Sequence, residues 1–383
     1  MKLLVPCAAG VEASVKRQLM ALGYGECPAI GGRISLEGDW ADVARLNIFL
    51  RAGERVLVAV GEFPATTFDE LYDGVYSLPW EEFLTAHSQI RMDGKCFKSK
   101  LMAVKACGGV AKKAIVSRVK EKLGVRNLDE NGERAIVGVS ILEDTATVTL
   151  DTSGDGLHKR GYRTLAYDAP LKETVAAAMI ESSVYRAGKL FADLFCGSGT
   201  LPIEAALYAL NIAPGARREF DFTRWKGTPA VLKAAREEAE DLRDKKTRLT
   251  LFASDISERA ISIAQFHAKR AGVSEHIRFS VSDMRAFSSQ ERYGVLVSNP
   301  PYGERMEKGE DLFPLYRDFA HTFRKLPDWS CYFLSAYGDA ERAFGGRADK
   351  RRKLYNANLA CGFYGYLGKK PPRPSADDNP VKS

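Results

Sequence analysis

A glycine-rich turn after an apolar segment is the part of this sequence with the clearest chemical meaning. Residues 190–195 predict a buried strand that carries Asp193, and Gly197 and Gly199 follow before a helix that begins near Thr200. Glycines let the backbone turn tightly and approach a ligand closely, and a helix amino terminus offers free N–H groups. The segment therefore predicts a ligand site, with a plain strand–turn–helix that binds nothing as the alternative.

Acidic residues near this turn decide between two cofactors. A dinucleotide fingerprint needs a third glycine and an acid about 20 residues further on, but Pro202 occupies the place of that glycine. An acid at position 193 suits a cationic amino group, Asp255 could accept both ribose hydroxyls, and Asp283 could accept the adenine amino group. All three carboxylates lie at the ends of successive predicted strands, where open α/β sheets bind ligands. This set predicts S-adenosylmethionine as the cofactor.

The second informative segment is NPPYGER, residues 299–305, directly after the predicted strand 294–298. Two successive prolines fix φ, so the Asn299 amide oxygen and the Pro300 carbonyl become acceptors aimed at one point. A planar exocyclic amine held there would turn its lone pair toward a methyl sulfonium, which is catalysis by orientation and electrostatics without a strong base. Tyr302 gives a base an aromatic face for stacking. The predicted catalytic residues are Asn299, Pro300, Pro301 and Tyr302, and a structural Pro-Pro turn is the alternative.

The other reactive side chains indicate no further chemistry. The five histidines share no metal-ligand spacing with the cysteines, so no metal site is predicted. Cys196 lies in the glycine turn, but no base is placed beside it for a covalent mechanism. The seven cysteines are scattered without a CxxC pair, which indicates a reducing cytoplasm. No apolar run approaches the ~20 residues that span a bilayer, and no signal peptide is predicted.

The elements that must position these residues divide the 383-residue chain into four parts. Residues 1–55 read as a small α/β unit and residues 56–152 as a second α/β module. Residues 153–368 form a larger, more regular α/β region, and residues 369–383 a Pro-rich, polar tail that is predicted to be disordered. In the second module the expected helices are 80–84 and 111–123, and the expected strands are 55–60, 89–92, 135–142 and 146–150.

The third part is predicted to be a Rossmann-like, doubly wound sheet, because apolar strands alternate with helical stretches. Its last two strands are joined too tightly to be parallel. A charged, helical insertion is expected over residues 225–248, with no chemistry assigned to it. The expected strands are residues 190–195, 249–254, 277–281, 294–298, 331–336, 353–356 and 359–366.

Positive charge is concentrated in one stretch of the second module. Residues 90–126 contain eleven Lys or Arg and two acids, which is a net +9, while the whole chain nets +7. A concentrated patch indicates a polyanionic partner, although a basic helix can also be a merely solvated face. We expect phosphate contacts that position RNA and carry little sequence information. The predicted RNA-binding residues are Lys112, Lys113, Arg118, Lys120, Lys122, Lys159, Arg160 and Arg163.

Four motifs together carry a family resemblance. DLFCGSGTLPIEAA and NPPYGER resemble the class I S-adenosylmethionine-dependent methyltransferases that modify amino groups. GLHKRGYR (156–163) and APLKET (169–174) resemble, more narrowly, the THUMP-domain RNA guanosine N2-methyltransferases, and among these the RlmL-type family, which methylates large-subunit ribosomal RNA. The resemblance covers essentially the whole chain. It implies a ferredoxin-like region and a THUMP domain ahead of a methyltransferase domain whose last strand is antiparallel.

The resemblance also assigns residues to the cofactor. It implies that Asp193, Gly197 and Gly199 hold the methionine end, that Asp255 and Ile256 hold ribose and adenine, and that Asp283 and Met284 hold the adenine. RlmL proteins of some bacteria carry a second methyltransferase domain, so this chain, which ends at Ser383, is expected to be a stand-alone form. The full set of predicted cofactor contacts is Glu173, Thr174, Asp193, Cys196, Gly197, Gly199, Thr200, Asp255, Ile256, Asp283, Met284 and Asn299.

The expected function is transfer of a methyl group to the exocyclic N2 of a guanosine, most plausibly in large-subunit ribosomal RNA. The base would have to leave its helix to reach Asn299. A transfer RNA guanosine is the nearest alternative. Adenine N6 or a protein glutamine would also suit the loop, and a non-catalytic RNA-binding assembly factor is the alternative from a different class. The oligomeric state is left open by the sequence.

Overall fold

The computed structural model describes residues 1–165, 171–302, 311–357 and 359–372. The chain divides into two units, the first made of Met1–Gly161 with Ile212–Arg243 and the second of Tyr162–Asn211 with Asp244–Ser383. Three segments named in the sequence analysis lie outside the described residues. They are the end of the NPPYGER motif (303–305), the start of the APLKET motif (169–170) and most of the tail (373–383). Among the helices that the structure describes, none has the length and apolar character needed to cross a membrane.

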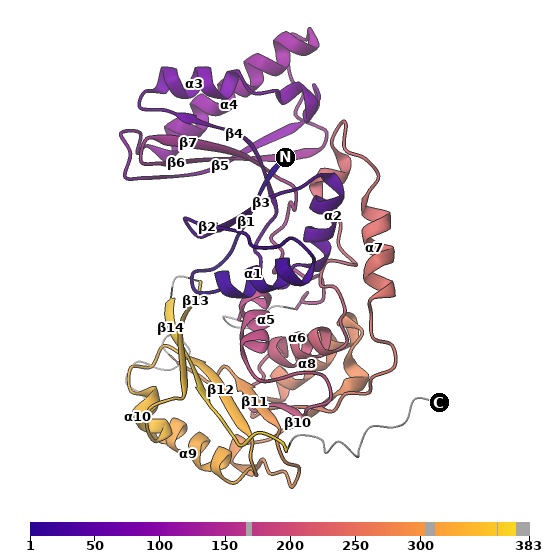
Figure 1. Cartoon of the computed structure of the whole chain (residues 1–383), viewed down its shortest axis with the longest axis vertical. Helices are drawn as coiled ribbons and strands as arrows, with labels where there is room; N and C mark the ends of the chain where they lie inside the picture. Colours follow the sequence, from indigo (N-terminus) through magenta and orange to yellow (C-terminus); the bar gives the residue numbers. More distant parts are fainter. Residues whose placement is uncertain (166–170, 303–310, 358, 373–383) are drawn as a thin grey trace. The chain divides into compact units, whose positions relative to one another are not determined.

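The first unit contains one sheet and its covering helices (Figure 1). Its elements are β1 (Lys2–Pro6), α1 (Glu12–Ala21), β2 (Ala29–Ile30), β3 (Arg33–Glu37), α2 (Trp40–Phe49), β4 (Leu57–Pro64), α3 (Phe68–Tyr76), η1 (Trp80–Glu82), β5 (Gln89–Phe97), α4 (Val104–Leu123), β6 (Arg134–Leu142), β7 (Thr145–Asp151), η2 (Asp221–Arg224) and α7 (Leu232–Asp241).

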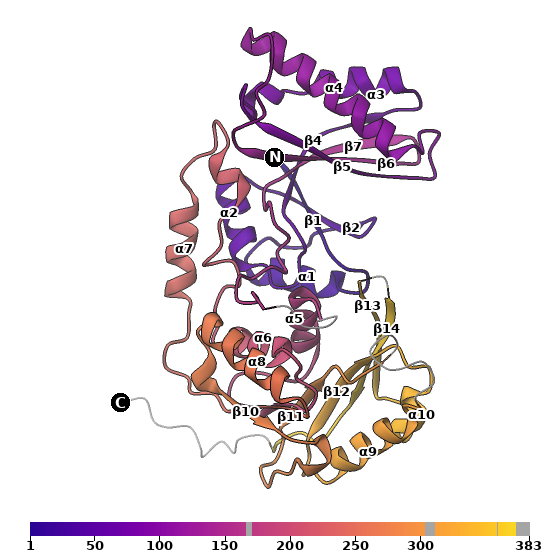
Figure 2. The same cartoon turned by 180° about the vertical axis from the view of Figure 1, so that it is seen from behind.

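The seven strands follow the order β2-β3-β1-β4-β7-β6-β5, so the two modules expected from the sequence share one sheet. The link is a short antiparallel pairing in which Leu3 lies opposite Val58 and Leu4 opposite Leu57. Helices α3 and α4 cover one face of β4–β7, as both views show (Figures 1 and 2). The β6–β7 hairpin turns through Glu143 and Asp144, whose positive φ values of 50° and 61° match a type I′ turn.

Two helices of this unit differ from the expectation. The sequence analysis gave no helix over 68–76, where α3 forms behind a capping box: Thr67 accepts from the Glu70 N–H, and Glu70 reaches back to the Thr67 N–H. Helix α4 begins at Val104, seven residues before the predicted start, because Gly108 and Gly109 are tolerated inside it. The expected helix at 80–84 is the short η1.

The segment Ile212–Arg243 directly follows Tyr162–Asn211 of the second unit in sequence but belongs to the first unit. The Arg45 guanidinium donates to both carboxylate oxygens of Glu238 in α7, at 2.8 and 2.7 Å. Arg134 forms the same two-pronged contact with Asp221, at 2.6 and 3.1 Å. The helical insertion is confirmed in α7, and its packing on the first unit was not foreseen from the sequence.

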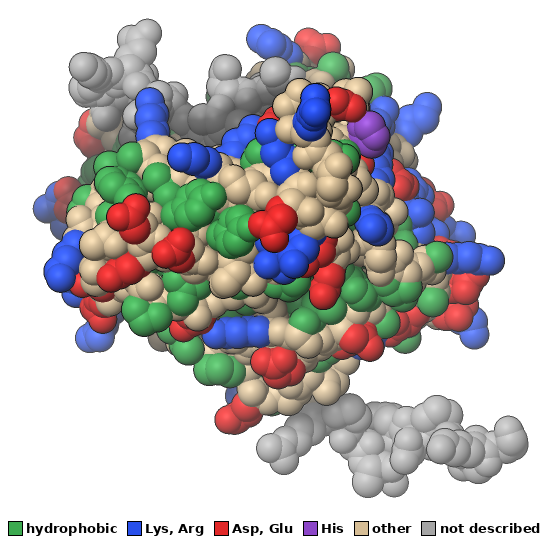
Figure 3. Space-filling model, turned by 90° about the horizontal axis from the view of Figure 1, so that it is seen from above, with side chains coloured by type: hydrophobic (Ala, Val, Ile, Leu, Met, Phe, Trp, Pro, Cys, Tyr) green, Lys and Arg blue, Asp and Glu red, His purple; other side chains and the backbone are tan. Residues whose placement is uncertain are grey.

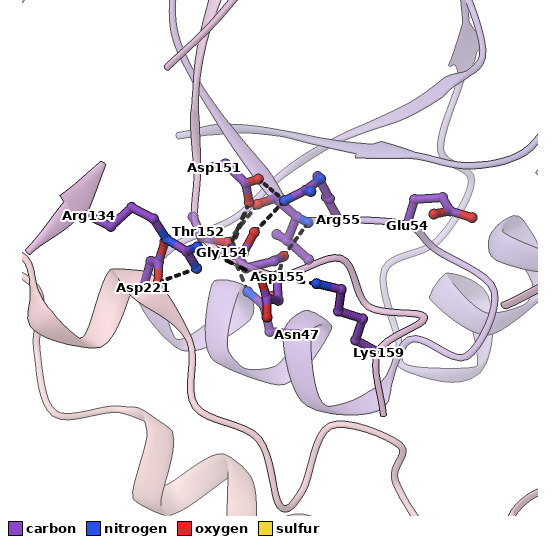
Figure 4. Close-up of polar contacts among 12 residues, drawn as sticks. Asn47, Glu54, Arg55, Arg134, Asp151, Thr152, Gly154, Asp155, Lys159 and Asp221 are labelled. Atoms are coloured by element: carbon purple, nitrogen blue, oxygen red, sulfur yellow. Dashed lines mark hydrogen bonds and ion pairs between the residues drawn. The ribbon is translucent and has the colours of Figure 1, made fainter. Parts of the chain in front are cut away.

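A polar cluster at the end of β7 holds this unit together (Figure 4). The Asn47 amide of α2 donates to the Thr152 hydroxyl at 2.9 Å and accepts from the Ser153 hydroxyl at 2.6 Å. The Arg55 guanidinium pairs with the buried Asp151 carboxylate. Burial raises the pKa of Asp151 to about 6, and the Arg55 charge opposes that rise.

The second unit contains the Rossmann-like sheet. Its elements are α5 (Glu173–Ser182), β8 (Phe191–Asp193), α6 (Thr200–Ala209), β9 (Leu251–Asp255), α8 (Glu258–Ala271), η3 (Ser274–His276), β10 (Ile277–Val281), η4 (Met284–Ala286), β11 (Val295–Ser298), α9 (Phe313–Arg324), β12 (Ser330–Ser335), α10 (Ala340–Phe344), β13 (Lys350–Asn356) and β14 (Leu359–Tyr366).

The predicted doubly wound sheet is confirmed, with strand order β10-β9-β8-β11-β12-β14-β13. Strands β8–β12 are parallel, and β14 lies antiparallel between β12 and β13. Helices α9 and α10 lie on one face and α5, α6 and α8 on the other (Figures 1 and 2). Phe319, Phe333 and Phe344 form an aromatic core on the α9–α10 face. Because β8 and β11 are central neighbours, the glycine turn and the Asn-Pro-Pro-Tyr segment leave the sheet from adjacent strands.

Candidate active site

The glycine turn joins β8 to α6 and depends on two left-handed residues. Gly197 has a φ of 50° and Gly199 a φ of 87°, a region that L side chains rarely adopt. A Cβ on Gly199 would also lie 2.9 Å from the Ala264 Cβ in α8. Both glycines are therefore required for the turn itself, and the close packing keeps its backbone against the sheet edge. Thr200, the first residue of α6, is buried behind the turn.

Asp193 ends β8 and is fully buried. Its Oδ1 accepts from the Ser298 hydroxyl at 2.8 Å and from the Phe195 N–H at 3.2 Å. Its Oδ2 is buried and has no hydrogen-bond donor among the described residues. Burial raises the pKa of Asp193 to about 7, the two hydrogen bonds oppose the rise, and nearby Asp255 adds to it. An unpartnered, buried carboxylate oxygen fits a cationic ligand group.

Asp255 ends β9 and faces the same turn. Its Oδ2 accepts from the Gly197 N–H at 2.9 Å, and its Oδ1 accepts from the Ser257 N–H at 3.0 Å. The adjacent Ile256 side chain is 74% exposed, which leaves an apolar face free to cover a flat ring. This neighbourhood suits the predicted ribose and adenine contacts of Asp255 and Ile256.

Asp283 and Met284, the two residues predicted to contact the adenine, follow β10. Their side chains differ in how accessible they are to a ligand. Asp283 accepts from the Arg285 N–H at 2.8 Å and pairs with the Arg285 guanidinium, but its side chain remains 45% exposed. The Met284 side chain instead lies in the hydrophobic core, where its sulfur contacts the Thr322 hydroxyl at 3.8 Å. Side-chain contact with adenine is therefore open to Asp283 and closed to Met284 in this structure.

The start of α5 holds two further predicted cofactor contacts. Glu173 is buried, and its Oε2 lies 3.1 Å from the Arg163 guanidinium. Arg163 also donates to the Leu171 carbonyl at 3.1 Å. Thr174 is buried as well. The ion pair explains how the Glu173 carboxylate can be buried here. It also means that the Arg163 guanidinium, which was predicted to contact RNA, already binds two groups of this unit.

The predicted catalytic loop leaves β11 immediately after Ser298. Asn299 is 6% exposed, and its Oδ1 has no hydrogen-bond donor among the described residues. The next residue, Pro300, is buried, and the Pro301 carbonyl accepts from the Tyr316 hydroxyl at 3.2 Å, which fixes the loop backbone on α9. A second buried acceptor without a donor therefore lies one strand away from Asp193.

Tyr302 is placed differently from the expectation. Its side chain is 4% exposed, and its hydroxyl accepts from the Asn356 amide of β13 at 3.3 Å. The ring faces are covered in this structure, so stacking on a base requires the ring to become uncovered. The rest of the motif, residues 303–305, lies outside the described residues.

His267 contacts the glycine turn, and the sequence analysis did not single it out. Its Nδ1–H donates to the Ser198 carbonyl of the glycine turn at 3.1 Å, and its Nε2 accepts from the Leu165 N–H at 3.4 Å. Burial lowers the pKa of His267, which favours the neutral ring that both contacts require. A histidine on the buried face of a helix gives no sequence signal for this role.

The glycine-turn cysteine has no reactive character. Burial raises the pKa of the Cys196 thiol well above its usual range, and Asp193 and Asp255 add to the rise. A thiol held neutral is a poor nucleophile. Among the described residues, no group of three His, Cys, Asp or Glu side chains is arranged to hold a metal ion.

The basic stretch is less positive in the fold than in the sequence. Residues 56–89 contain six acids and no Lys or Arg, so residues 56–126 net +3 rather than +9. Arg118 donates to both carboxylate oxygens of Glu81, at 3.0 and 2.7 Å, and Lys112 pairs with Glu130 at 2.8 Å. On the face that includes α3 and α4, basic side chains are interspersed with acidic ones (Figure 3). The acidic neighbours partly neutralise α4.

The remaining predicted phosphate contacts separate into two groups. Lys113 and Lys122 are exposed and Lys120 is partly exposed on α4. Arg160 is 6% exposed, and its guanidinium donates to the Leu157 and Arg51 carbonyls, so it is unavailable to a phosphate here. Lys159 is exposed and lies 3.6 Å from the Asp155 carboxylate (Figure 4).

Three family models match the chain in sequence order: the RlmL ferredoxin-like domain over residues 2–57, the THUMP domain over 65–151, and the RMKL-like methyltransferase domain over 160–364. Among similar proteins, YpsC of Bacillus subtilis (strain 168) is 38% identical over 380 residues, which are 98% of each chain.

Two further relatives bear on the chemistry. The ribosomal RNA large subunit methyltransferase K/L of Psychromonas ingrahamii is 32% identical over 98% of this chain, which spans about half (51%) of that relative's length. The solved structure of SMU.472, complexed with S-adenosylhomocysteine, matches with a TM-score of 0.91 at 38% identity, over 97% of this chain and 99% of that one. The chain therefore belongs to the RMKL-like family of S-adenosylmethionine-dependent RNA methyltransferases.

Proposed function

We propose that this chain transfers a methyl group to the exocyclic N2 of a guanosine in large-subunit ribosomal RNA. The observation that carries the proposal is the Asn299 Oδ1, a buried acceptor at the end of a central strand that receives no hydrogen bond from any residue the structure describes. Leaving such an acceptor unpaired costs about 1–3 kcal/mol, which is understandable where a substrate amine supplies the missing donor. The K/L relative, which is named for large-subunit ribosomal RNA, supports the choice of RNA.

The cofactor contributes an electrophilic methyl sulfonium, and the chain's residues supply position and charge. The Asp193 Oδ2 would pair with the ammonium group, the Asp255 carboxylate would accept from ribose, and the exposed Ile256 and Asp283 side chains would contact the adenine. Asn299 and the Pro300 carbonyl would each accept one N–H of the target amine and thereby direct its lone pair at the methyl carbon. Correct orientation supplies most of the rate acceleration where no strong base takes part.

The THUMP domain would hold the RNA that surrounds the target base. Lys105, Lys113, Lys120 and Lys122 of α4 have no acidic partner among the described residues, and of these the predicted contacts Lys113, Lys120 and Lys122 would contact phosphates. The extruded base would stack on Tyr302 once that ring is uncovered. Because the phosphate contacts carry no sequence information, the choice of guanosine depends on the shape of the RNA around it.

The rival substrates are a transfer RNA guanosine and adenine N6, since Asn299 can accept from either exocyclic amine. A non-catalytic assembly factor is the rival from another class. A protein that had lost catalysis would have no reason to keep both Asp193 and Asn299 buried with unpaired acceptor oxygens, which favours an enzyme.

The test is transfer of labelled methyl groups from S-adenosylmethionine to separated ribosomal and transfer RNA from cells that lack the protein, with Asn299→Ala as the inactive control. Digested nucleosides are then identified by mass. We expect N2-methylguanosine in large-subunit ribosomal RNA with the wild-type protein alone. Label in transfer RNA would change the substrate, N6-methyladenosine would change the target atom, and cofactor binding without transfer to any RNA would favour the assembly factor.

A further inference from the structure

Strand β13 forms the outer edge of the catalytic sheet and is strongly basic. Its sequence is KRRKLYN, and its one sheet neighbour is β14. Residues 347–353 contain five Lys or Arg and one acid, Asp349, and all five cations are exposed. This is the densest run of positive charge in the described part of the second unit, and the site chemistry above does not use it.

The cations of β13 differ in their partners. Arg351 is held by the Glu341 carboxylate at 3.1 Å, and its guanidinium lies over the Tyr364 ring at 5.5 Å. Lys350, Arg352 and Lys353 of β13, and Arg347 just before it, form no ion pair with an acidic side chain among the described residues, and Lys353 lies over the Tyr355 ring at 5.2 Å. These exposed charges are therefore unneutralised, unlike Arg118 and Lys112 of α4.

Two of the free cations, Lys350 and Arg352, point to the side of the sheet that carries the catalytic loop. Side chains alternate along a strand, so Lys350, Arg352, Leu354 and Asn356 share one face. Asn356, at the end of this row, donates to the Tyr302 hydroxyl at 3.3 Å. At ~3.3 Å per residue, Arg352 lies roughly 13 Å along the strand from Asn356. A row of free positive charges thus leads to the Asn-Pro-Pro-Tyr segment.

We propose that β13 is a second RNA-binding surface, in which Lys350 and Arg352 hold phosphates of the strand that carries the target nucleotide. The inference rests on the proposed function and adds a substrate contact on the catalytic domain itself. Free cations on one face of β13 complement a polyanion. A phosphate held by Arg352, roughly 13 Å along the strand from Asn356, would fix the RNA strand a short distance from Tyr302 while the rest of the RNA is held elsewhere.

A different explanation for charge on β13 is protection of an exposed strand edge against pairing with other chains. Edge protection needs charge of either sign, whereas phosphate binding needs positive charge. The double substitution K350E/R352E separates the two roles, because it keeps two charges on the edge and reverses their sign. K269E/K325E is the matched control, since Lys269 and Lys325 are also exposed cations of this unit.

The experiment measures RNA affinity at about 50 and 200 mM salt, together with methyl transfer, cofactor affinity and elution from a sizing column. Each lost phosphate contact lowers the slope of log affinity against log salt by about 0.7–0.9. If two contacts are lost, the drop in RNA affinity between the two salt concentrations should be roughly tenfold smaller for the variant than for wild type. We expect K350E/R352E to raise KM for RNA, with cofactor affinity and elution unchanged and with the control variant like wild type.

Single substitutions protect the test against a folding failure. R352Q should weaken RNA binding, and R351Q, its neighbour on the opposite face, should leave binding nearly unchanged. If K350E/R352E and R352Q bind and methylate RNA as wild type does, the β13 surface is refuted while the proposed function stands. Aggregation of R352Q with normal RNA affinity would assign the charge to edge protection. A wild-type protein that binds and methylates no RNA would refute both proposals.

Discussion

Asp193→Asn is the substitution for which the structure makes the sharpest prediction. The wild-type carboxylate is fully buried, and its Oδ2 lacks a donor among the described residues. An amide keeps the shape and can still accept from the Ser298 hydroxyl and the Phe195 N–H, but it carries no charge. We therefore expect this variant to stabilise the ligand-free protein at alkaline pH and at the same time to abolish cofactor binding.

The magnitude follows from the raised pKa. The pKa of Asp193 rises from 3.8 to about 7, and each unit corresponds to about 1.4 kcal/mol, which gives an upper limit of about 4 kcal/mol. Because the folded pKa exceeds the unfolded one, the cost of the ionised group is small below about pH 4, grows between pH 4 and 7, and is constant above that. Local relaxation and water penetration reduce the cost, so a gain of about 2–4 kcal/mol is expected at pH 8.

Thermal unfolding of the ligand-free proteins at pH 8 and pH 5 measures this gain. For a unit of 150–250 residues, each kcal/mol shifts Tm by about 2–4 °C, so Asp193→Asn should raise Tm by about 4–16 °C at pH 8. At pH 5 the gain should fall to less than half. Asp283→Asn is the control, because the same change on a side chain that is 45% exposed should give no such gain.

Calorimetry of cofactor binding gives an independent measurement. Below pH 7 the wild-type Asp193 must lose its proton to pair with the ammonium group, so binding near pH 6 should release almost one proton, and this release should disappear as the pH rises through 7. The reasoning is refuted if Asp193→Asn is no more stable than wild type at pH 8, if its gain is equal at both pH values, or if it binds the cofactor normally.

Three further substitutions test the neighbouring parts of the site. Asn299→Ala should lower kcat by about 10²–10³ and change cofactor affinity by less than about threefold in calorimetry; retained transfer would rule out its catalytic role. His267→Leu should weaken cofactor binding about 5–30-fold through one lost hydrogen bond, while His267→Asn, which keeps a donor at the Nδ1 position, should bind nearly normally; equal losses would indicate a packing role alone. Gly199→Ala should destabilise by about 1–3 kcal/mol in denaturant unfolding and lose cofactor affinity, because its Cβ would meet Ala264. Gly188→Ala, also at positive φ but with nothing within 4 Å, should keep cofactor affinity, and a loss there would show that the effect is not local.

Local patterns were sufficient for most of the catalytic sheet. Buried parallel strands are nearly continuous apolar runs, so β8–β12 are recognisable, and the tight β13–β14 connection leaves antiparallel pairing as the sole option. Asp193, Asp255 and Asp283 lie at or just after the ends of three strands that are consecutive in the sequence. Because these strands are parallel, the three carboxylates lie at the carboxyl-terminal edge of the sheet. The missed helix α3 also had a local signal, the Thr67–Glu70 capping box, which the sequence analysis did not use.

Contacts between distant segments were not predictable in this way. The acidic partners of α4 lie far away in the sequence: Glu81 is thirty-seven residues before Arg118, and Glu130 is eighteen residues after Lys112. The sequence alone does not distinguish Arg160 from an exposed arginine that binds phosphate. In the fold its guanidinium is buried and donates to two backbone carbonyls. The packing of Ile212–Arg243 on the first unit likewise depends on pairs such as Arg45 and Glu238 that no local pattern connects.

The two buried acceptors belong to one structural element rather than two separate sites. Ser298, the last residue of β11, donates its hydroxyl to Asp193 and accepts from the Leu194 N–H at 3.2 Å, and Asn299 follows it directly. A shift of β11 against β8 would therefore change the separation of Asp193 and Asn299, and the Ser298 hydrogen bonds across the two strands oppose such a shift. Each unpaired oxygen costs the ligand-free protein about 1–3 kcal/mol, and rigid packing between central strands keeps both in place. In the proposed function, the cofactor would supply the charge that Asp193 lacks and the target amine the donor that Asn299 lacks, so the geometry that destabilises the free protein would also align the two reactants.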